Sequence, residues 1–248
     1  MREEDGTLHA TLWNVIQANC RAQFTADDFS FVVRVLAKSP RDAVSLVSLL
    51  SDLEERDAIL DHDLIYNSVV DQAGCLQVSA AFYFYILTRR VLRRVSLDER
   101  ALTDYVAAVL LAFTNINQLN APEDKNSTVR NFTYVSDILT RLNSCSPEQG
   151  YVLRLHLANY TLFLSGMFVE RVHSHAQRRG APGLSFYEAV GQSSFLSAAQ
   201  HPQAKRTELQ AIFEMLGSEF RRVRFALNDL TDTLLHLHEP PSIVIRPS

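Results

Sequence analysis

The sequence predicts an all-α protein: a multi-helix bundle of about nine or ten helices, with a smaller helical N-terminal part packed on it. Two observations carry this prediction. Apolar residues recur at steps of three and four, which is the spacing of one helix face. The apolar stretches also open with residues that cap helices. Ser39 and Ser146 each precede a proline, which favours the first helical position.

Three further serines stand three positions before a glutamate, the pattern of a capping box. They are Ser51, Ser96 and Ser185. In a capping box the serine hydroxyl and the glutamate carboxylate satisfy amide groups that the helix leaves unpaired. We therefore expect a helix to begin at each of these serines.

The N-terminal part is expected to contain short helices. Thr7 caps a first helix to about Phe24, and Thr25 caps a second that ends before residue 40. A third helix covers residues 40–50, with an apolar stripe of Val44, Val47 and Leu50. A fourth starts at Ser51, and apolar residues resume at 64–70. Gly74 follows this region, where a glycine after a helix is expected.

The remaining chain is expected to form the main bundle. Helices are predicted over residues 79–92, 96–119, 129–142, 146–179, 185–199 and 202–238. The fourth of these is expected to bend near Gly166, and the last is one long amphipathic helix. We divide the chain into residues 1–75 and residues 76–248, and one continuous domain stays open as the alternative.

Charge and cysteine content restrict the function classes. The net charge is −4, which argues against a nucleic-acid binder with a basic face. Residues 1–75 hold 6 Lys/Arg and 13 Asp/Glu, a net charge of −7, whereas residues 76–248 carry a net charge of +3. The three cysteines are far apart in sequence, as in free thiols in a reducing cytoplasm. No apolar run reaches the length that crosses a bilayer, so we expect no membrane span.

A small-molecule pocket is one possible site. Phe82 to Tyr85 are four consecutive aromatic residues, followed by arginines at helical spacing. A second helix carries polar groups among apolar neighbours, which need partners if they are buried. The candidate lining residues on the two helices are Tyr83, Tyr85, Arg89, His156 and Tyr160. The competing interpretation is a core of packed aromatic residues with hydrogen-bonded polar groups.

A metal site is a weaker hypothesis. Glu170 and His173 have the Glu-x-x-His spacing that carboxylate-bridged di-iron bundles use. Such bundles need a second copy of this motif, and the sequence contains none. No specific cofactor is implied.

The sequence favours a non-enzymatic cytoplasmic interaction or regulatory protein. It contains no nucleophile elbow and no glycine-rich phosphate loop. The uneven charge and the long terminal amphipathic helix favour a protein partner or a homo-oligomer. The alternative is a helical bundle that binds a small molecule or cofactor in the aromatic, arginine- and histidine-lined pocket.

Overall fold

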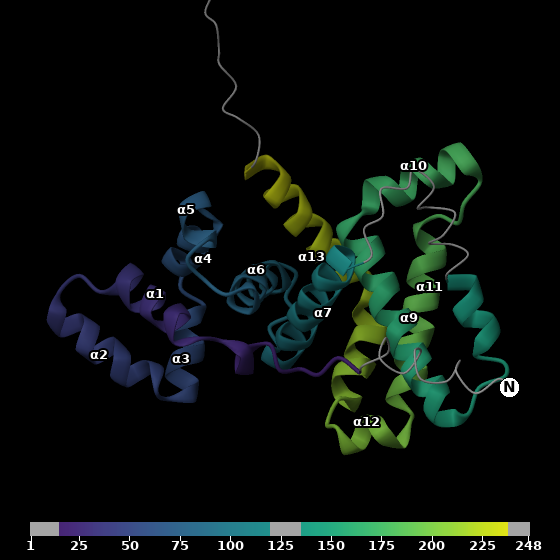
Figure 1. Ribbon diagram of the computed structural model, residues 1–248, viewed down its shortest axis with the longest axis horizontal. Coiled ribbons are helices and arrows are strands. Elements are labelled where there is room, and N and C mark those ends of the chain that lie inside the picture. The colour runs from purple at the N-terminus through teal and green to yellow at the C-terminus, as the bar shows by residue number, and fades with distance from the viewer. Residues whose placement is uncertain (1–14, 120–134, 238–248) are drawn as a thin grey trace, which may run out of the picture.

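The computed structural model describes residues 15–119 and 135–237, and within these ranges it consists of helices and turns (Figure 1). No β-strand occurs in the described residues. The prediction of an all-α, multi-helix protein is therefore confirmed for this part of the chain.

The front of the molecule contains one 3-10 turn and five helices, α1 to α5. Their bounds are η1 Arg21–Gln23, α1 Ala26–Leu36, α2 Pro40–Leu50, α3 Leu53–Leu60, α4 Asp63–Val70 and α5 Gln72–Cys75. The first three of these helices form what we call the arm, which projects at one end of the molecule (Figure 1). Within the arm, α2 packs against α1 and α3. Outside it, α4 packs against α1 and α6.

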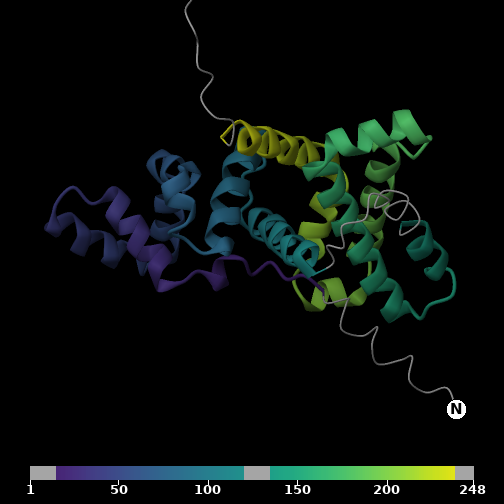
Figure 2. The ribbon, with the colours of Figure 1, turned by 45° about the horizontal axis from the view of Figure 1, so that its top comes forward.

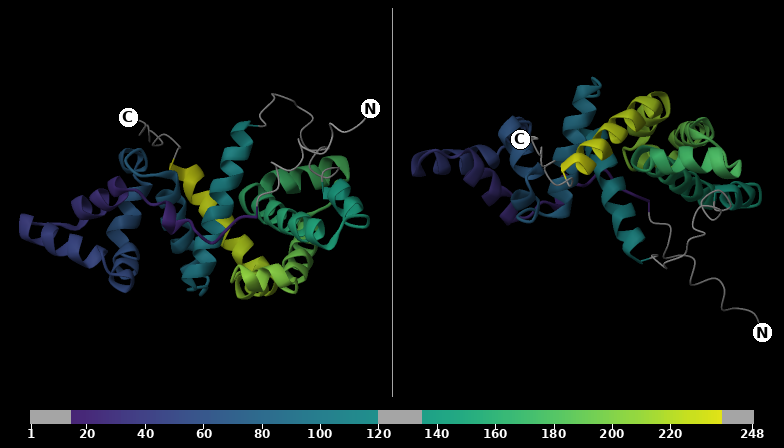
Figure 3. Two further views of the ribbon diagram at one scale, coloured as in Figure 1. Left: turned by 60° about the horizontal axis from the view of Figure 1, so that its bottom comes forward. Right: turned by 90° about the horizontal axis from the view of Figure 1, so that it is seen from above.

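The rest of the chain forms the bundle. Its helices are α6 Ala80–Arg94, α7 Arg100–Leu119, α9 Pro147–Met167, α10 Val169–Arg179, α11 Leu184–Ala199, α12 Pro202–Arg206 and α13 Gln210–Leu237, with residues 135–141 also helical. Helix α13 packs against α9 and α11 and continues across α6 and α7 (Figure 2). The arm and the group α9–α12 consequently lie at opposite ends, with α6, α7 and α13 between them (Figure 3).

Several predicted helix starts are confirmed at the atomic level. The side chains of Thr25, Ser39, Ser79 and Ser146 each accept a hydrogen bond from the backbone N–H three residues later. At Ser146 a capping box forms with Gln149, and Pro147 occupies the first helical position. The predicted bend is also present: α9 and α10 meet at about 90° after Met167.

Other predicted boundaries are wrong. Residues 15–24 form irregular chain and the 3-10 turn η1, and residues 7–14 of the predicted first helix lie outside the described residues. Ser96 has a left-handed backbone (φ 58°) and ends α6, and α7 begins only at Arg100. Asp52 caps α3 in place of Ser51, and α11 begins before Ser185. The predicted final helix is broken between α12 and α13, where Glu208 has φ 58°.

Helix α6 joins the front of the molecule to the bundle because it buries two faces. Phe82, Tyr85 and Ile86 belong to the apolar cluster of the front helices. Leu87 and Leu92 belong to the central cluster, together with residues of α7, α9, α11 and α13. A third cluster lies among residues 135–141, α9, α10 and α11. Packing therefore crosses the boundary expected at residue 75, and the division into two domains stays a prediction.

Candidate functional site

The arm exposes apolar side chains that the sequence pattern assigns to the core. Of the predicted stripe on α2, only Leu50 is buried, whereas Val44 is 73% exposed and Val47 is 58% exposed. Leu49 at the end of α2 and Leu53 at the start of α3 are also exposed. Val44 and Val47 are three positions apart and share one side of α2, and we call these two residues the arm face; Leu49, two positions after Val47, lies on the other side of the helix. Exposed apolar residues that share one helix face are typical of an interaction surface.

Acidic side chains are exposed on the same helices of the arm. Asp42 on α2 and Asp52, Glu54 and Glu55 around the start of α3 are all exposed. Over the front helices, residues 26–75, the chain carries 4 Lys/Arg and 10 Asp/Glu. The front helices therefore combine exposed apolar groups with a net negative charge.

The long terminal helix gives no comparable surface in its described residues. The apolar stripe of α13 is buried against α9, α11 and α6. Its members include Leu216, Phe220, Val223, Leu227 and Leu230. The part of the interaction hypothesis that rested on this helix therefore shifts to the arm.

The five candidate pocket residues fall into two separate groups. Tyr83, Tyr85 and Arg89 lie on α6, while His156 and Tyr160 lie on α9, and α7 packs against both helices. Tyr85 is completely buried in the front cluster, with its ring edge-on to that of Phe24 at 5.5 Å. Burial is the largest cause that raises the pKa of Tyr85, so its hydroxyl stays protonated.

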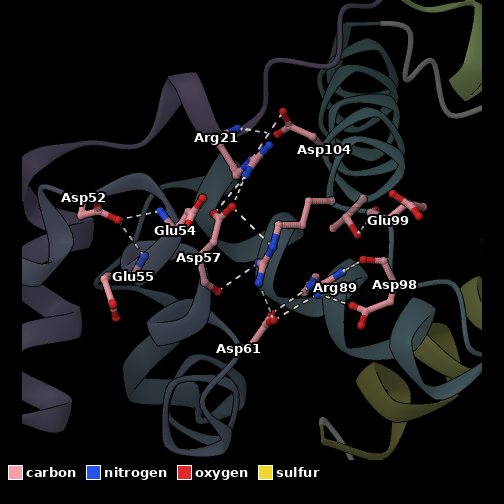
Figure 4. Close-up of polar contacts among 12 residues, drawn as sticks. Arg21, Asp52, Glu54, Glu55, Asp57, Asp61, Arg89, Asp98, Glu99 and Asp104 are labelled. Atoms are coloured by element: carbon pink, nitrogen blue, oxygen red, sulfur yellow. Dashed lines mark hydrogen bonds and ion pairs between the residues drawn. The ribbon is translucent and has the colours of Figure 1, made fainter.

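Arg89 belongs to a network of arginines and aspartates between the arm and the bundle (Figure 4). Its side chain is only 4% exposed. Nε and Nη2 of Arg89 donate to the two carboxylate oxygens of Asp61, at 2.8 and 3.0 Å, and Nη2 also donates to Asp98. Arg89, which the sequence analysis predicts to line a ligand pocket, thus pairs with carboxylates of the chain itself.

The network extends to both sides of Arg89 (Figure 4). Arg100 donates to Asp61 Oδ2 at 3.0 Å and to the backbone carbonyl of Asp57 at 3.0 Å. Arg21 donates to the Asp57 carboxylate at 2.8 Å, and its backbone N–H donates to Asp104 at 2.7 Å. Each of these cations faces a carboxylate of the chain, so the network clamps α3 to α6 and α7, and none of these three guanidinium groups is left unpaired for a ligand.

The electrostatics of Asp61 follow from this geometry. Burial acts to raise its pKa, but the hydrogen bond from Arg89 and the charges of Arg89, Arg100 and Arg93 outweigh it, so the pKa is lowered from its ordinary value. Asp61 is consequently ionised throughout the physiological range and holds the clamp together.

His156 and Tyr160 form an aromatic group with Phe113 of α7. The imidazole centre lies 5.9 Å from the Phe113 ring and 6.2 Å from the Tyr160 ring. Burial lowers the pKa of His156 from 6.5 to about 4. The imidazole is therefore neutral at pH 7, as expected for a histidine packed among aromatic rings.

Glu170 and His173 lie on α10, and both are exposed. Among residues 15–119 and 135–237, no group of three or more His, Cys, Asp or Glu side chains is placed to hold a metal ion. The described residues thus add no further ligands to this pair.

One hollow combines residues that the sequence pattern did not connect. It has a volume of about 290 Å³ and lies where the start of α9, the end of α11 and the start of α12 meet. Arg154 and His201 line it, and they are 47 positions apart in the chain. No local signal links two such distant residues, and only the packing of α9 against α11 and α12 brings them to one hollow.

Within the described residues, no single helix is both long and apolar enough to cross a membrane. Helices α9 and α10 reach that length and composition only when taken together, across their 90° bend. Comparisons with protein-family models, with curated proteins and with solved structures find no match to this chain.

Proposed function

We propose that this protein is a helical interaction protein whose arm face docks a basic amphipathic helix of a partner. The observation that carries the proposal is the exposure of Val44 and Val47 on α2, at helical spacing, on a projecting arm of net negative charge. Helices whose apolar residues recur at three and four positions bind such surfaces through those residues.

Charge complementarity selects the partner. Asp42, Asp52, Glu54 and Glu55 are exposed on α2 and around the start of α3, and they attract lysine and arginine side chains on the polar face of an incoming helix. The same carboxylates repel an acidic helix of equal hydrophobicity. Apolar contact therefore supplies affinity, and the exposed carboxylates of the arm supply specificity and make binding depend on salt concentration.

The first experiment uses synthetic peptides as probes. One is an amphipathic helix with leucines at three- and four-residue steps and lysines elsewhere, and the second replaces lysine with glutamate. A third has the composition of the first in scrambled order. We expect only the first peptide to bind, with saturable changes in the amide NMR resonances of α2 and α3. Its affinity should fall as the NaCl concentration is raised.

A matched pair of variants tests the surface. Burying each of Val44 and Val47 contributes about 1 kcal/mol, so Val44→Ser with Val47→Ser should weaken binding at least tenfold. Leu76→Ser is the control, because Leu76 is 87% exposed and lies outside the arm face. The proposal is overturned if the lysine and glutamate peptides bind with equal affinity. It is also overturned if Leu76→Ser weakens binding of the lysine peptide as much as the double variant does.

Self-association is a competing outcome, measured by light scattering after size-exclusion chromatography. A dimer that the Val44→Ser, Val47→Ser variant converts to a monomer would assign the arm face to a second copy of this chain, and would replace the proposed partner. A monomer that binds the lysine peptide supports the proposal as stated.

A further inference from the structure

The hollow between α9, α11 and α12 contains a cation that has no counter-charge among the described residues. Arg154 on α9 is half-buried, and its guanidinium makes no hydrogen bond or ion pair with a described residue. Of the other buried or half-buried arginines in the described residues, Arg56 lies over the Phe29 ring, and the rest have carboxylate partners: Arg21, Arg89, Arg90, Arg100 and Arg224. Among the residues that the structure describes, no Asp or Glu lines the hollow. An uncompensated, half-buried guanidinium is a binding position for an anion.

A histidine adds a second donor. His201 is the N-cap of α12, and its Nδ1 accepts a hydrogen bond from the backbone N–H of Gln203 at 3.3 Å. The neutral ring therefore carries its proton on Nε2, which makes Nε2 a hydrogen-bond donor. The ring stacks on that of Tyr151 at 4.6 Å with an interplanar angle of 22°. Tyr151 is buried, so the stack fixes the orientation of the imidazole on one wall of the hollow.

The first turns of α9 contribute one wall and space. Pro147, Gly150, Tyr151 and Arg154 line the hollow at the spacing of one helix face, so it runs along the side of α9. Gly150 lacks a side chain that would occupy the volume. Apolar groups of Leu142 and Ala198 complete the wall. The surroundings combine two donors of positive or partial positive charge with an apolar surface.

We propose that this hollow binds a phosphate monoester of a small apolar or aromatic alcohol. Arg154 pairs with two phosphate oxygens and His201 Nε2 donates to a phosphate oxygen, while the organic group packs against the apolar wall. A phosphate dianion fits better than a carboxylate because it offers three acceptor oxygens and more negative charge to Arg154 and His201. A volume of about 290 Å³ accommodates a ligand the size of a single ring with its phosphate. The site lies at the opposite end of the molecule from the arm face, so it stands independently of the proposed docking function (Figure 1).

The test is titration with phenyl phosphate, followed by amide NMR shifts and by calorimetry. We expect saturable shifts confined to the start of α9, the end of α11 and α12, with millimolar or tighter affinity. Inorganic phosphate should bind more weakly because it lacks the organic group, and phenol should not bind because it lacks the anion. Benzoate, which carries a carboxylate in place of the phosphate, should bind more weakly than phenyl phosphate. Saturable binding of phenol as strong as that of phenyl phosphate shows an apolar cavity, and overturns the proposal.

Two variants locate the site. Arg154→Gln should weaken phenyl phosphate at least tenfold, and His201→Asn should weaken it several-fold while keeping a residue that caps α12. Arg178→Gln is the control, because Arg178 is exposed on α10 and does not line the hollow. Amide NMR spectra of each variant confirm that the fold is retained. Identical affinity in Arg154→Gln and Arg178→Gln, or no saturable shift in the unmodified protein at about 10 mM ligand, overturns the proposal.

Discussion

Single charged residues acquire their roles in this protein from partners distant in sequence. Arg89 stands in a run of arginines and is a candidate pocket residue by sequence, yet Asp61, 28 positions earlier, pairs with its guanidinium. Arg154, which no motif marks, has no such partner among the described residues. Burial and pairing, which depend on tertiary contacts, decide which arginine is available to a ligand.

His156 predicts a specific dependence of stability on pH. Its pKa is about 4 in the folded protein and 6.5 when unfolded, so the unfolded state binds more protons between these values. Its contribution to the free energy of unfolding is complete above pH 6.5 and is lost as the pH falls towards 4. The shift corresponds to about 3 kcal/mol at most.

The measurement is urea unfolding of the protein and of His156→Gln between pH 4 and 7.5. We expect the difference in unfolding free energy between the two proteins to shrink as the pH falls through this window. Asp61 does not confuse the result, because its lowered pKa moves its effect below the ordinary value of 3.8. A difference independent of pH contradicts the buried neutral state of His156.

At the scale of elements, two helix starts share one carboxylate. Asp28 completes the capping box of α1 by accepting from the backbone N–H of Thr25 at 2.7 Å. It also accepts from the backbone N–H of Ser79 at 2.6 Å and from the Ser79 hydroxyl at 2.7 Å. Ser79 in turn caps α6. The caps at Thr25 and Ser79 are each readable from the sequence, but their connection through Asp28 is a tertiary contact.

We expect Asp28→Asn to lower the free energy of unfolding by about 2–4 kcal/mol. The amide keeps the shape of the side chain but loses one acceptor oxygen and the charge, inside a completely buried site. Asp27→Asn is the control, since Asp27 is exposed in the same first turn and should cost less than about 1 kcal/mol. Chemical denaturation of both variants measures the free energy of unfolding. Similar losses of unfolding free energy in the two variants would show that Asp28 acts only as an ordinary first-turn charge.

At the scale of the whole molecule, close packing of helices overrides helix propensity. Gly191 lies within α11, where a Cβ would come within 2.3 Å of the Phe220 ring on α13 and 2.8 Å of Thr161 Oγ1 on α9. The three helices approach this closely because position 191 has no side chain. Gly150 differs, because a Cβ there would meet only Cys145 Sγ, at an ordinary distance of 3.5 Å.

Two alanine substitutions should therefore have opposite signs. Gly150→Ala should stabilise the protein by about 0.5–1 kcal/mol, the gain expected in a helix interior. Gly191→Ala should destabilise it by about 1–3 kcal/mol through overpacking, although its local propensity gain is the same. Thermal unfolding measures both, and a stabilising Gly191→Ala would contradict the close contact of α9, α11 and α13.

The sequence by itself determined the helical class, the caps at Thr25, Ser39, Ser79 and Ser146, and the bend after α9, because capping and periodicity are local interactions. Local rules did not locate the break before α13 or the start of α7, where Glu208 and Ser96 adopt left-handed backbone angles. Nor did they separate the exposed Val44 from the buried Leu50, or bring Arg154 to His201. Tertiary structure alone decided these features, because burial and charge pairing arise only when helices distant in sequence pack together.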